Sequence, residues 1–361
     1  MEPISFDKLK KGVLKHCKPE GQAIQLSTVE TKSIKWLHPG RIPRGKITIL
    51  AGDPDVGKTF LTLDIASRVS TGTTWPDGAP NEAGNVLILS AEDDLADTIV
   101  PRLKASKANL NQILALTTVR KRTNNNELVE AVPTLTDDLD TIEKEISIHE
   151  PKLIIIDPIN AYLPGVDTHR DAELRTKVFA PLKKLAEDNE IAVLCVMHLN
   201  KSNSQSAKHR VSGSIAYVAA SRATWLITND KDDHSRKLMI PVKFNIGPKP
   251  DGLAYKIIEN DQKEPVIAWE ADPIEIDPDE ALSHENESSA PEREYAKEFL
   301  LQILDNGAVP AEDIFSEAET HDITKRTLKR AKEQLKVEAI RRYEKGKRGV
   351  QGWSWKLREE I

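Results

Sequence analysis

One eight-residue stretch constrains the fold of this chain more than any other feature. It fits the pattern G-x-x-x-x-G-K-[ST] and consists of Gly52, Asp53, Pro54, Asp55, Val56, Gly57, Lys58 and Thr59. A β-branched apolar run at residues 46–51 precedes it, and apolar residues recur at helical spacing over residues 60–69. Strand, glycine-rich loop and helix in this order are typical of a loop whose backbone N–H groups surround a phosphate.

The residue types in the loop fit a nucleoside triphosphate with its metal ion. Gly52 and Gly57 let the backbone approach the anion, because no Cβ stands in the way. Lys58 is expected to reach the β- and γ-phosphates, and the hydroxyl of Thr59 to ligate Mg²⁺. The alternative is a chance match in a surface turn, which the flanking strand and helix make less common. We therefore predict a bound nucleotide with Mg²⁺ and expect the whole loop and Phe60 to contact the nucleotide. The loop alone does not distinguish a kinase, a GTPase, a transporter subunit or a motor.

The composition describes a well-hydrated protein that is large enough for a full core. Of 361 residues, 39% are hydrophobic and 30% charged, and this length favours two or three domains. Cys17 and Cys195 are too far apart in the sequence to indicate a disulfide framework, and the apolar run around Cys195 is typical of a core position. No secretion leader and no apolar run of membrane length is visible, so we expect a cytoplasmic protein that does not bind membranes.

Strand-like and helix-like stretches alternate over residues 34–268. We expect strands at 46–51, 86–90, 113–119, 153–156, 191–197 and 223–228, with helices at 135–149 and 171–188, and a closing pair of strands at 238–244 and 254–259. Apolar strands that alternate with amphipathic helices predict an α/β domain with a mostly parallel sheet covered on both faces.

The flanking regions differ from this domain in composition. Residues 1–33 form a polar lead-in, and residues 269–291 are acidic and resemble a flexible linker. Helices expected at 295–304, 311–317 and 324–335, followed by a hairpin over 343–355, predict a winged-helix domain at 292–361.

The overall net charge of −6 hides a strongly basic stretch near the C-terminus. Thirteen basic residues face three acidic ones between Lys325 and Arg358. This charge is the footprint expected of duplex DNA binding. The alternative is a solvated basic helix in a protein-interaction module.

Three further strand ends carry polar groups, and ligands of open α/β sheets bind at the carboxyl ends of strands. Asp157 ends the strand at 153–156 and could hold the Mg²⁺ shell, or could simply cap the turn before Pro158. Glu92 follows the strand at 86–90 and could activate the attacking water, or could cap the next helix. His198 ends the strand at 191–197 and could sense the γ-phosphate, although a structural histidine is the alternative.

A small-residue helix at 213–222 ends in Arg222, just before the strand at 223–228. An isolated arginine there is commonly a partner in a surface ion pair. In a ring it could instead reach a neighbouring subunit's γ-phosphate and stabilise charge in the transition state.

Six motifs follow one another along the chain: residues 36–46, the phosphate loop, and residues 91–94, 156–158, 198–201 and 213–222. Together they resemble the RecA-like P-loop ATPases of the RepA-type hexameric replicative helicases and their mobile-element relatives, over roughly residues 30–260. The resemblance implies Glu92 as catalytic base, Asp157 as metal ligand, His198 as sensor and Arg222 as a finger that acts in trans. Lys243 resembles a second trans-acting basic residue. Asp55 departs from the pattern, because relatives commonly carry glycine or another small residue there.

We therefore expect an ATPase with ATP and Mg²⁺ as cofactors. It is expected to form a ring of six subunits and to move along DNA as a helicase of a plasmid, phage or integrated element. The polar, basic loop at 201–210 is a candidate for the single-strand contact in the ring channel, or else an ordinary solvated loop without aromatic residues for stacking. The rival readings are an ATP-switched initiator or helicase loader, a recombinase-like filament former, and a regulator without enzymatic activity.

Overall fold

The computed structural model describes residues 23–122, 126–167, 170–199, 215–283, 290–305, 307–321, 323–342 and 352–357. The chain divides into two compact units, Met1–Ile34 and Lys35–Ile361. Within the first unit, the described residues include one short 3₁₀ helix, η2 (Leu26–Thr28). The loop at 201–210, a predicted single-strand contact, lies outside the described residues.

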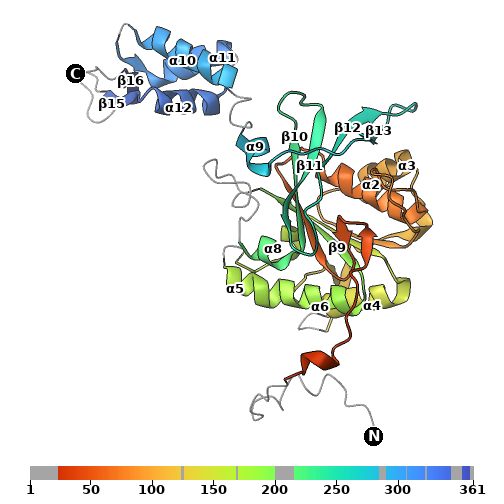
Figure 1. Cartoon of the computed structure of the whole chain (residues 1–361). Coiled ribbons are helices and arrows are strands. Elements are labelled where there is room, and N and C mark those ends of the chain that lie inside the picture. The colour runs from red at the N-terminus through yellow and green to blue at the C-terminus, as the bar shows by residue number, and fades with distance from the viewer. Residues whose placement is uncertain are drawn as a thin grey trace. The chain divides into compact units, whose positions relative to one another are not determined.

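A nine-stranded sheet is the frame of the second unit (Figure 1). Its order is β13-β12-β11-β10-β3-β9-β8-β4-β5. The strands from β10 to β5 in this order run parallel: β3 (Ile47–Gly52), β4 (Val86–Ser90), β5 (Ile113–Ala115), β8 (Leu153–Asp157), β9 (Ala192–His198) and β10 (Ala223–Asn229). Three antiparallel strands extend one edge: β11 (Arg236–Phe244), β12 (Leu253–Glu259) and β13 (Pro265–Trp269). The predicted α/β class with a mostly parallel sheet is confirmed.

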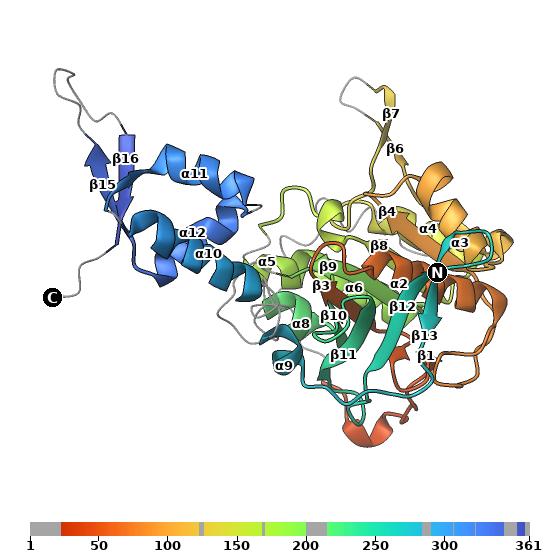
Figure 2. The ribbon, with the colours of Figure 1, turned by 90° about the horizontal axis from the view of Figure 1, so that it is seen from above.

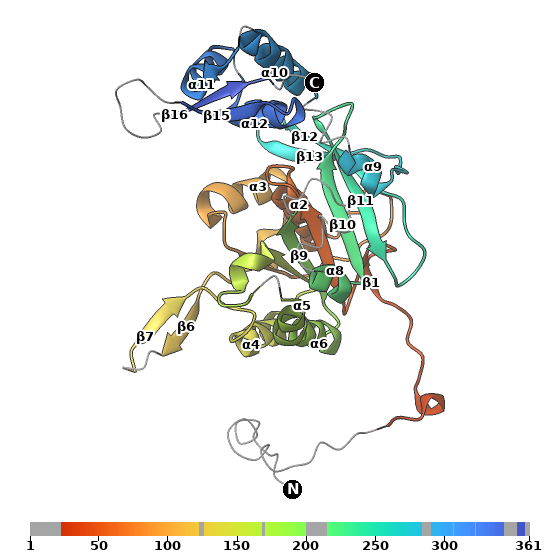
Figure 3. The same cartoon turned by 90° about the vertical axis from the view of Figure 1, so that its left-hand side faces the viewer.

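Helices cover both faces of this sheet (Figure 3). The helices α2 (Lys58–Thr71) and α3 (Val100–Ala105) pack on one face; α4 (Leu139–His149), α6 (Ala180–Asp188) and α8 (Ile215–Ala220) pack on the other. Successive residues of β3 point to opposite faces, so Ile49 joins one core cluster and Leu50 the other. Burial on both faces explains why these strands are continuous apolar runs.

Some elements differ from the sequence-based prediction. The strand expected at 113–119 ends at Ala115, and the chain then forms a hairpin of β6 (Val119–Arg122) and β7 (Leu128–Ala131) that projects from the body (Figure 2). The helix expected at 171–188 contains a π-helical segment, η6 (Arg175–Phe179), between α5 (Asp171–Leu174) and α6. The helix expected at 135–149 begins at Leu139, because the Asp138 carboxylate first accepts a hydrogen bond from the Thr134 N–H at 2.7 Å.

The remaining short elements connect the main ones. A small pair of strands, β1 (Trp36–His38) and β2 (Ile42–Pro43), precedes β3. The π-helical η3 (Leu95–Ile99) leads into α3, and two 3₁₀ helices, η4 (Leu110–Gln112) and η5 (Ile159–Tyr162), precede β5 and follow β8. Among the described residues, no helix combines the length and the apolar character that crossing a membrane requires.

The segment expected to be a flexible linker contains an ordered helix, α9 (Pro278–Ser283). Its residues Ala281 and Leu282 are buried in the same core cluster as α4 and α6. Packed structure therefore extends at least to this helix, beyond the boundary at residue 268 that the sequence indicated.

The C-terminal residues form three helices and a small sheet with a core of their own. The helices are α10 (Ala290–Leu304), α11 (Ala311–Thr320) and α12 (Lys325–Gln334), close to the three expected ones. The sheet has the order β14 (Val309–Pro310), β16 (Gly352–Lys356), β15 (Glu338–Arg342). The hairpin thus begins at Glu338 and not at residue 343, and its tip lies outside the described residues.

Candidate nucleotide-binding site

The glycine-rich loop joins the carboxyl end of β3 to the first turn of α2, and both of its glycines are required by their surroundings. Gly57 precedes the helix with φ 86°, in the left-handed region, and a Cβ there would lie 2.9 Å from Cδ1 of Ile257. A Cβ on Gly52 would lie 2.4 Å from the carbonyl oxygen of Ile227. The N-terminal N–H groups of α2 therefore face the loop without a side chain between them, an arrangement that attracts anions.

The Lys58 side chain is buried inside this loop. Its Nζ donates hydrogen bonds to the carbonyl oxygens of Gly52, at 3.1 Å, and Asp53, at 2.6 Å. Burial lowers the pKa of Lys58, and the nearby Asp157 carboxylate opposes that effect. Val56, also predicted to contact the nucleotide, points its side chain into the core, so only its backbone can meet a phosphate.

The carboxyl ends of four neighbouring strands bring Glu92, Asp157 and His198 to the loop. Strand β9 lies between β3 and β8, so His198 pairs in register with Gly52, while Asp157 pairs with Ser90 at the end of β4. Glu92 follows β4 closely, and its Oε1 lies 3.9 Å from Nε2 of His198. Burial lowers the pKa of His198, and its Nδ1 has no hydrogen-bond partner within the described part of the chain.

Asp157 is a buried carboxylate whose nearby positive charge, Lys58, does not offset the effect of burial. Its side chain is 7% exposed, and burial raises its pKa to about 6 although a hydrogen bond from Thr59 opposes the shift. A carboxylate beside a hydroxyl is the oxygen donor set that a hard dication such as Mg²⁺ prefers. Asp157 and Thr59 therefore fit the metal that the sequence predicts.

These groups surround a cavity of about 470 Å³. It is lined by Pro54, Asp55, Gly57, Lys58, Thr59, Phe60, Glu92, Asp93, Arg102, Asp157, His198 and Ile257. Three of these were not predicted: Asp93, Arg102 and Ile257. The guanidinium of Arg102 lies 4.2 Å from the centroid of the Phe60 ring, and its Nη1 lies 3.3 Å from Asp93 Oδ2. Arg102 shares the short helix α3 with Lys104, and no sequence pattern singled it out.

The neighbouring Asp94 has a different role from Asp93. Its carboxylate accepts hydrogen bonds from the N–H groups of Ala96 and Asp97 and so caps η3. Asp93, in contrast, pairs with Arg102 and lines the cavity.

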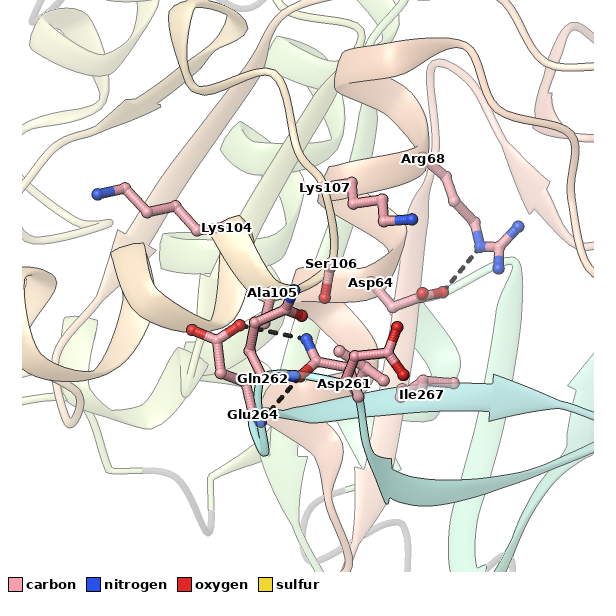
Figure 4. A pocket seen from close by; sticks show the side chains of 12 residues that line it. Asp64, Arg68, Lys104, Ala105, Ser106, Lys107, Asp261, Gln262, Glu264 and Ile267 are labelled. Atoms are coloured by element: carbon pink, nitrogen blue, oxygen red, sulfur yellow. Dashed lines mark hydrogen bonds and ion pairs between the residues drawn. The ribbon is translucent and has the colours of Figure 1, made fainter.

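A second cavity, of about 550 Å³, lies between α2, the end of α3 and the turn between β12 and β13 (Figure 4). Its walls carry Lys104 and Lys107 as well as Asp261 and Glu264, and on α2 the Asp64 and Arg68 side chains already pair at 2.9 Å. None of the predicted site residues lines it. The smaller cavity at the loop is therefore the one that fits a triphosphate.

Arg222 and Lys243 lie at the opposite edge of the sheet. The Arg222 N–H donates to the carbonyl of Ile47, at the start of β3, whereas the loop follows the far end of that strand. A strand of this length spans roughly 17 Å. Nζ of Lys243 donates to the carbonyls of Val218, Ala219 and Ser221 and so closes the end of α8. In one copy of the chain, the structure thus brings neither residue to the loop.

Fold and site together define a RecA-like P-loop ATPase. A family model described as "AAA domain" matches residues 16–204, more than half of the chain, and the chain belongs to this family. It is also similar to the DNA repair protein RadA of Chlamydia pneumoniae, with 25% identity over 165 residues, 45% of this chain and 30% of the relative. RadA of Mycobacterium tuberculosis is 28% identical over 166 residues, 45% of this chain and 28% of the relative. The chain thus spans less than a third of the length of these curated relatives.

Proposed function

We propose that this protein is an ATP-hydrolysing, ring-forming motor that acts on DNA in the cytoplasm, as a RepA-type replicative helicase of a plasmid, phage or integrated element. The observation that carries the proposal is the separation of its two groups of site residues. Lys58, Asp157 and Glu92 gather at one edge of the sheet, and Arg222 lies at the other. Only a neighbouring copy, placed head to tail, can bring an arginine of that edge to the phosphates.

Within one copy, we assign roles from the contacts around the loop. Lys58, Thr59 and Asp157 hold the triphosphate and its Mg²⁺, which when bound neutralises charge on the phosphate oxygens. Glu92 accepts the proton of the attacking water. His198, 3.9 Å from Glu92, senses whether the γ-phosphate is present.

The neighbouring copy would supply positive charge to the transition state. Arg222 stabilises the charge that develops on the transferred phosphoryl group. Lys243 closes the end of α8 through three carbonyls, so its first effect is to position the segment that carries Arg222.

DNA as the partner rests on two observations. Relatives named DNA repair protein RadA match 165 and 166 residues of this chain. The C-terminal unit combines the helices α10, α11 and α12 with the sheet of β14, β16 and β15, and its sequence is strongly basic over residues 325–358. These two features support the winged-helix domain that we propose there. We propose that this unit, from about residue 292, holds duplex DNA while the ring holds one strand.

A strand-displacement assay on a tailed duplex tests the proposal, with Lys58→Ala as the inactive reference and Lys104→Ala as a matched surface control. We expect ATP-dependent displacement by the wild type and the control only. ATP hydrolysis that is stimulated by DNA but is not accompanied by strand displacement would contradict the proposed helicase activity.

The names of the relatives favour one alternative, a recombinase-like ATPase without unwinding activity. Electron microscopy with ATP and single-stranded DNA separates the two. Closed rings, of six subunits in our proposal, support the motor, and helical filaments support the alternative.

A further inference from the structure

A hollow on the C-terminal unit gathers positive charge in one place. It has a volume of about 420 Å³ and is lined by Lys329, Lys332, Lys336, Val337 and Trp355. Lys329 and Lys332 belong to α12, Lys336 follows the end of that helix, and Trp355 lies on β16. The spacing of three residues places Lys329 and Lys332 on the same side of α12, and Lys336 lines the same hollow from beyond the helix end.

The floor of the hollow is rigid. The Trp355 ring is 5% exposed and packs edge-on against Phe315, with ring centroids 5.3 Å apart. Nζ of Lys332 lies 4.3 Å from the centroid of the Trp355 ring, so a cation–π contact orients this ammonium group. Lys329 and Lys336 are exposed and form no ion pair with any residue that the structure describes.

Two helices of the unit, α11 and α12, carry net charge of opposite sign. Exposed acids lie on α11, at Glu312, Asp313, Glu317 and Glu319, whereas the lysines lie on α12 and just after it. A polyanion is therefore attracted to the side of α12 and repelled from α11. The negative end of the α12 dipole also lies near the hollow, so the ammonium groups must supply the attraction.

We propose that this hollow is a binding site for the phosphate backbone of duplex DNA. The inference rests on the proposed function, because it locates the nucleic acid on which the motor would act. A single phosphate would fill little of 420 Å³, whereas successive phosphates of one strand can meet several ammonium groups. Lysine is a point charge without the planar fork that reads bases, so contacts here position the duplex and carry no sequence information.

A single strand fits the hollow less well than a duplex does. Binding of single strands draws on open aromatic faces for base stacking. Trp355 offers no such face, because it is 5% exposed and Nζ of Lys332 lies over its ring.

The test uses the full chain and fluorescence anisotropy with two short duplexes of unrelated sequence, over a salt series. We expect the variant Lys329→Gln/Lys332→Gln/Lys336→Gln to bind both duplexes at least about tenfold more weakly, by the same factor. The slope of log K against log salt should become shallower by roughly 2 to 3, because each lost phosphate contact removes about 0.9. The variant with arginine at the same three positions should keep its affinity, which separates charge from folding.

A matched control neutralises three exposed lysines of the ATPase region, Lys104, Lys144 and Lys249, and should bind like the wild type. Full duplex affinity in the triple glutamine variant would overturn the proposal, as would equal losses in the control or in the arginine variant. Saturable binding of tripolyphosphate to the protein, without binding of either duplex, would also overturn it. Lys58→Ala removes hydrolysis without changing any residue of the hollow, so it should bind duplex like the wild type. Failure of the motor and failure of this site are therefore distinguishable.

Discussion

At the scale of single residues, the candidate metal site depends on the buried Asp157. Its pKa of about 6 lies above the ordinary aspartate value, so folding disfavours the charged form. The destabilisation is fully present above about pH 6 and disappears as the pH falls below about 4, where the unfolded chain is protonated as well. A bound dication would supply the missing positive charge.

Asp157→Asn should therefore stabilise the ligand-free protein at neutral pH, by at most about 3 kcal/mol for a shift of about two pKa units. The same variant should lose the stabilisation that the wild type gains from Mg²⁺ and ATP. Thermal unfolding with and without the ligand checks both effects. An unchanged ligand-free midpoint together with an intact ligand effect would contradict the assignment of Asp157 as metal ligand.

Asp55 is a second residue with a measurable effect. Its φ is 64°, a left-handed conformation that glycine adopts freely, and its exposed carboxylate lines the cavity at the loop. Removing this charge should raise ATP affinity about two- to fivefold, since it repels the triphosphate through a largely aqueous medium. In a titration with a fluorescent nucleotide at low salt, Asp55→Asn and Asp55→Gly should show the same gain in affinity. The gain should be smaller at high salt, because salt screens the repulsion. Weaker binding by Asp55→Asn would show that the carboxylate helps to hold the ligand.

At the scale of elements, the β1–β2 pair is fastened to the domain by a buried polar network. His38 stacks on Trp75 at 4.3 Å between ring centroids, and its Nε2 lies 2.9 Å from Asp77 Oδ2. The Nε of Arg41 donates to the same oxygen at 2.9 Å. Burial lowers the pKa of His38, and the Asp77 carboxylate opposes the shift without reversing it.

This network predicts a loss of stability in mild acid. Because the folded pKa of His38 is below the ordinary value of about 6.5, the unfolded chain takes up the proton first as the pH falls. The free energy of unfolding is therefore unaffected by His38 protonation above about pH 6.5. Below that pH it decreases, by about 1.4 kcal/mol per unit of pKa depression. His38→Gln should show a smaller decrease between about pH 7 and pH 5 in denaturant titrations. Identical curves for the variant and the wild type would contradict this.

The elements that the sequence predicted well are those whose pattern has one dominant cause. Strands β3, β8 and β9 are buried on both faces, so their residues had to be apolar throughout, and the glycine loop has few conformations that suit a phosphate. The β6–β7 hairpin was missed because its exposed Leu128 and Val129 follow no single buried face. Arg222 and the loop lie at opposite edges because β10 and β3 are parallel, with Arg222 before its strand and the loop after β3. That β10 lies directly beside β3 is a matter of strand order, which sequence spacing does not contain.

At the scale of the whole molecule, the ATPase and the C-terminal unit have separate cores and should lose function separately. Truncation after Ser289 should weaken duplex binding at least about tenfold, because the basic stretch is removed. Basal hydrolysis should remain, since none of the residues at the loop cavity is lost. Fluorescence anisotropy and a phosphate-release assay on the same preparation check the two effects. Unchanged duplex binding would show that the C-terminal unit does not bind duplex DNA.

The central claim is that two copies share each ATP site, and turnover in mixed assemblies tests it most directly. Glu92→Gln and Arg222→Ala should each reduce turnover at least about a hundredfold when assayed alone. In an equal mixture, about a quarter of the interfaces would pair an intact Glu92 with an intact Arg222 of the neighbour. We predict that the mixture recovers a measurable part of wild-type ATP turnover, and a mixture as inactive as its components would contradict a site completed in trans.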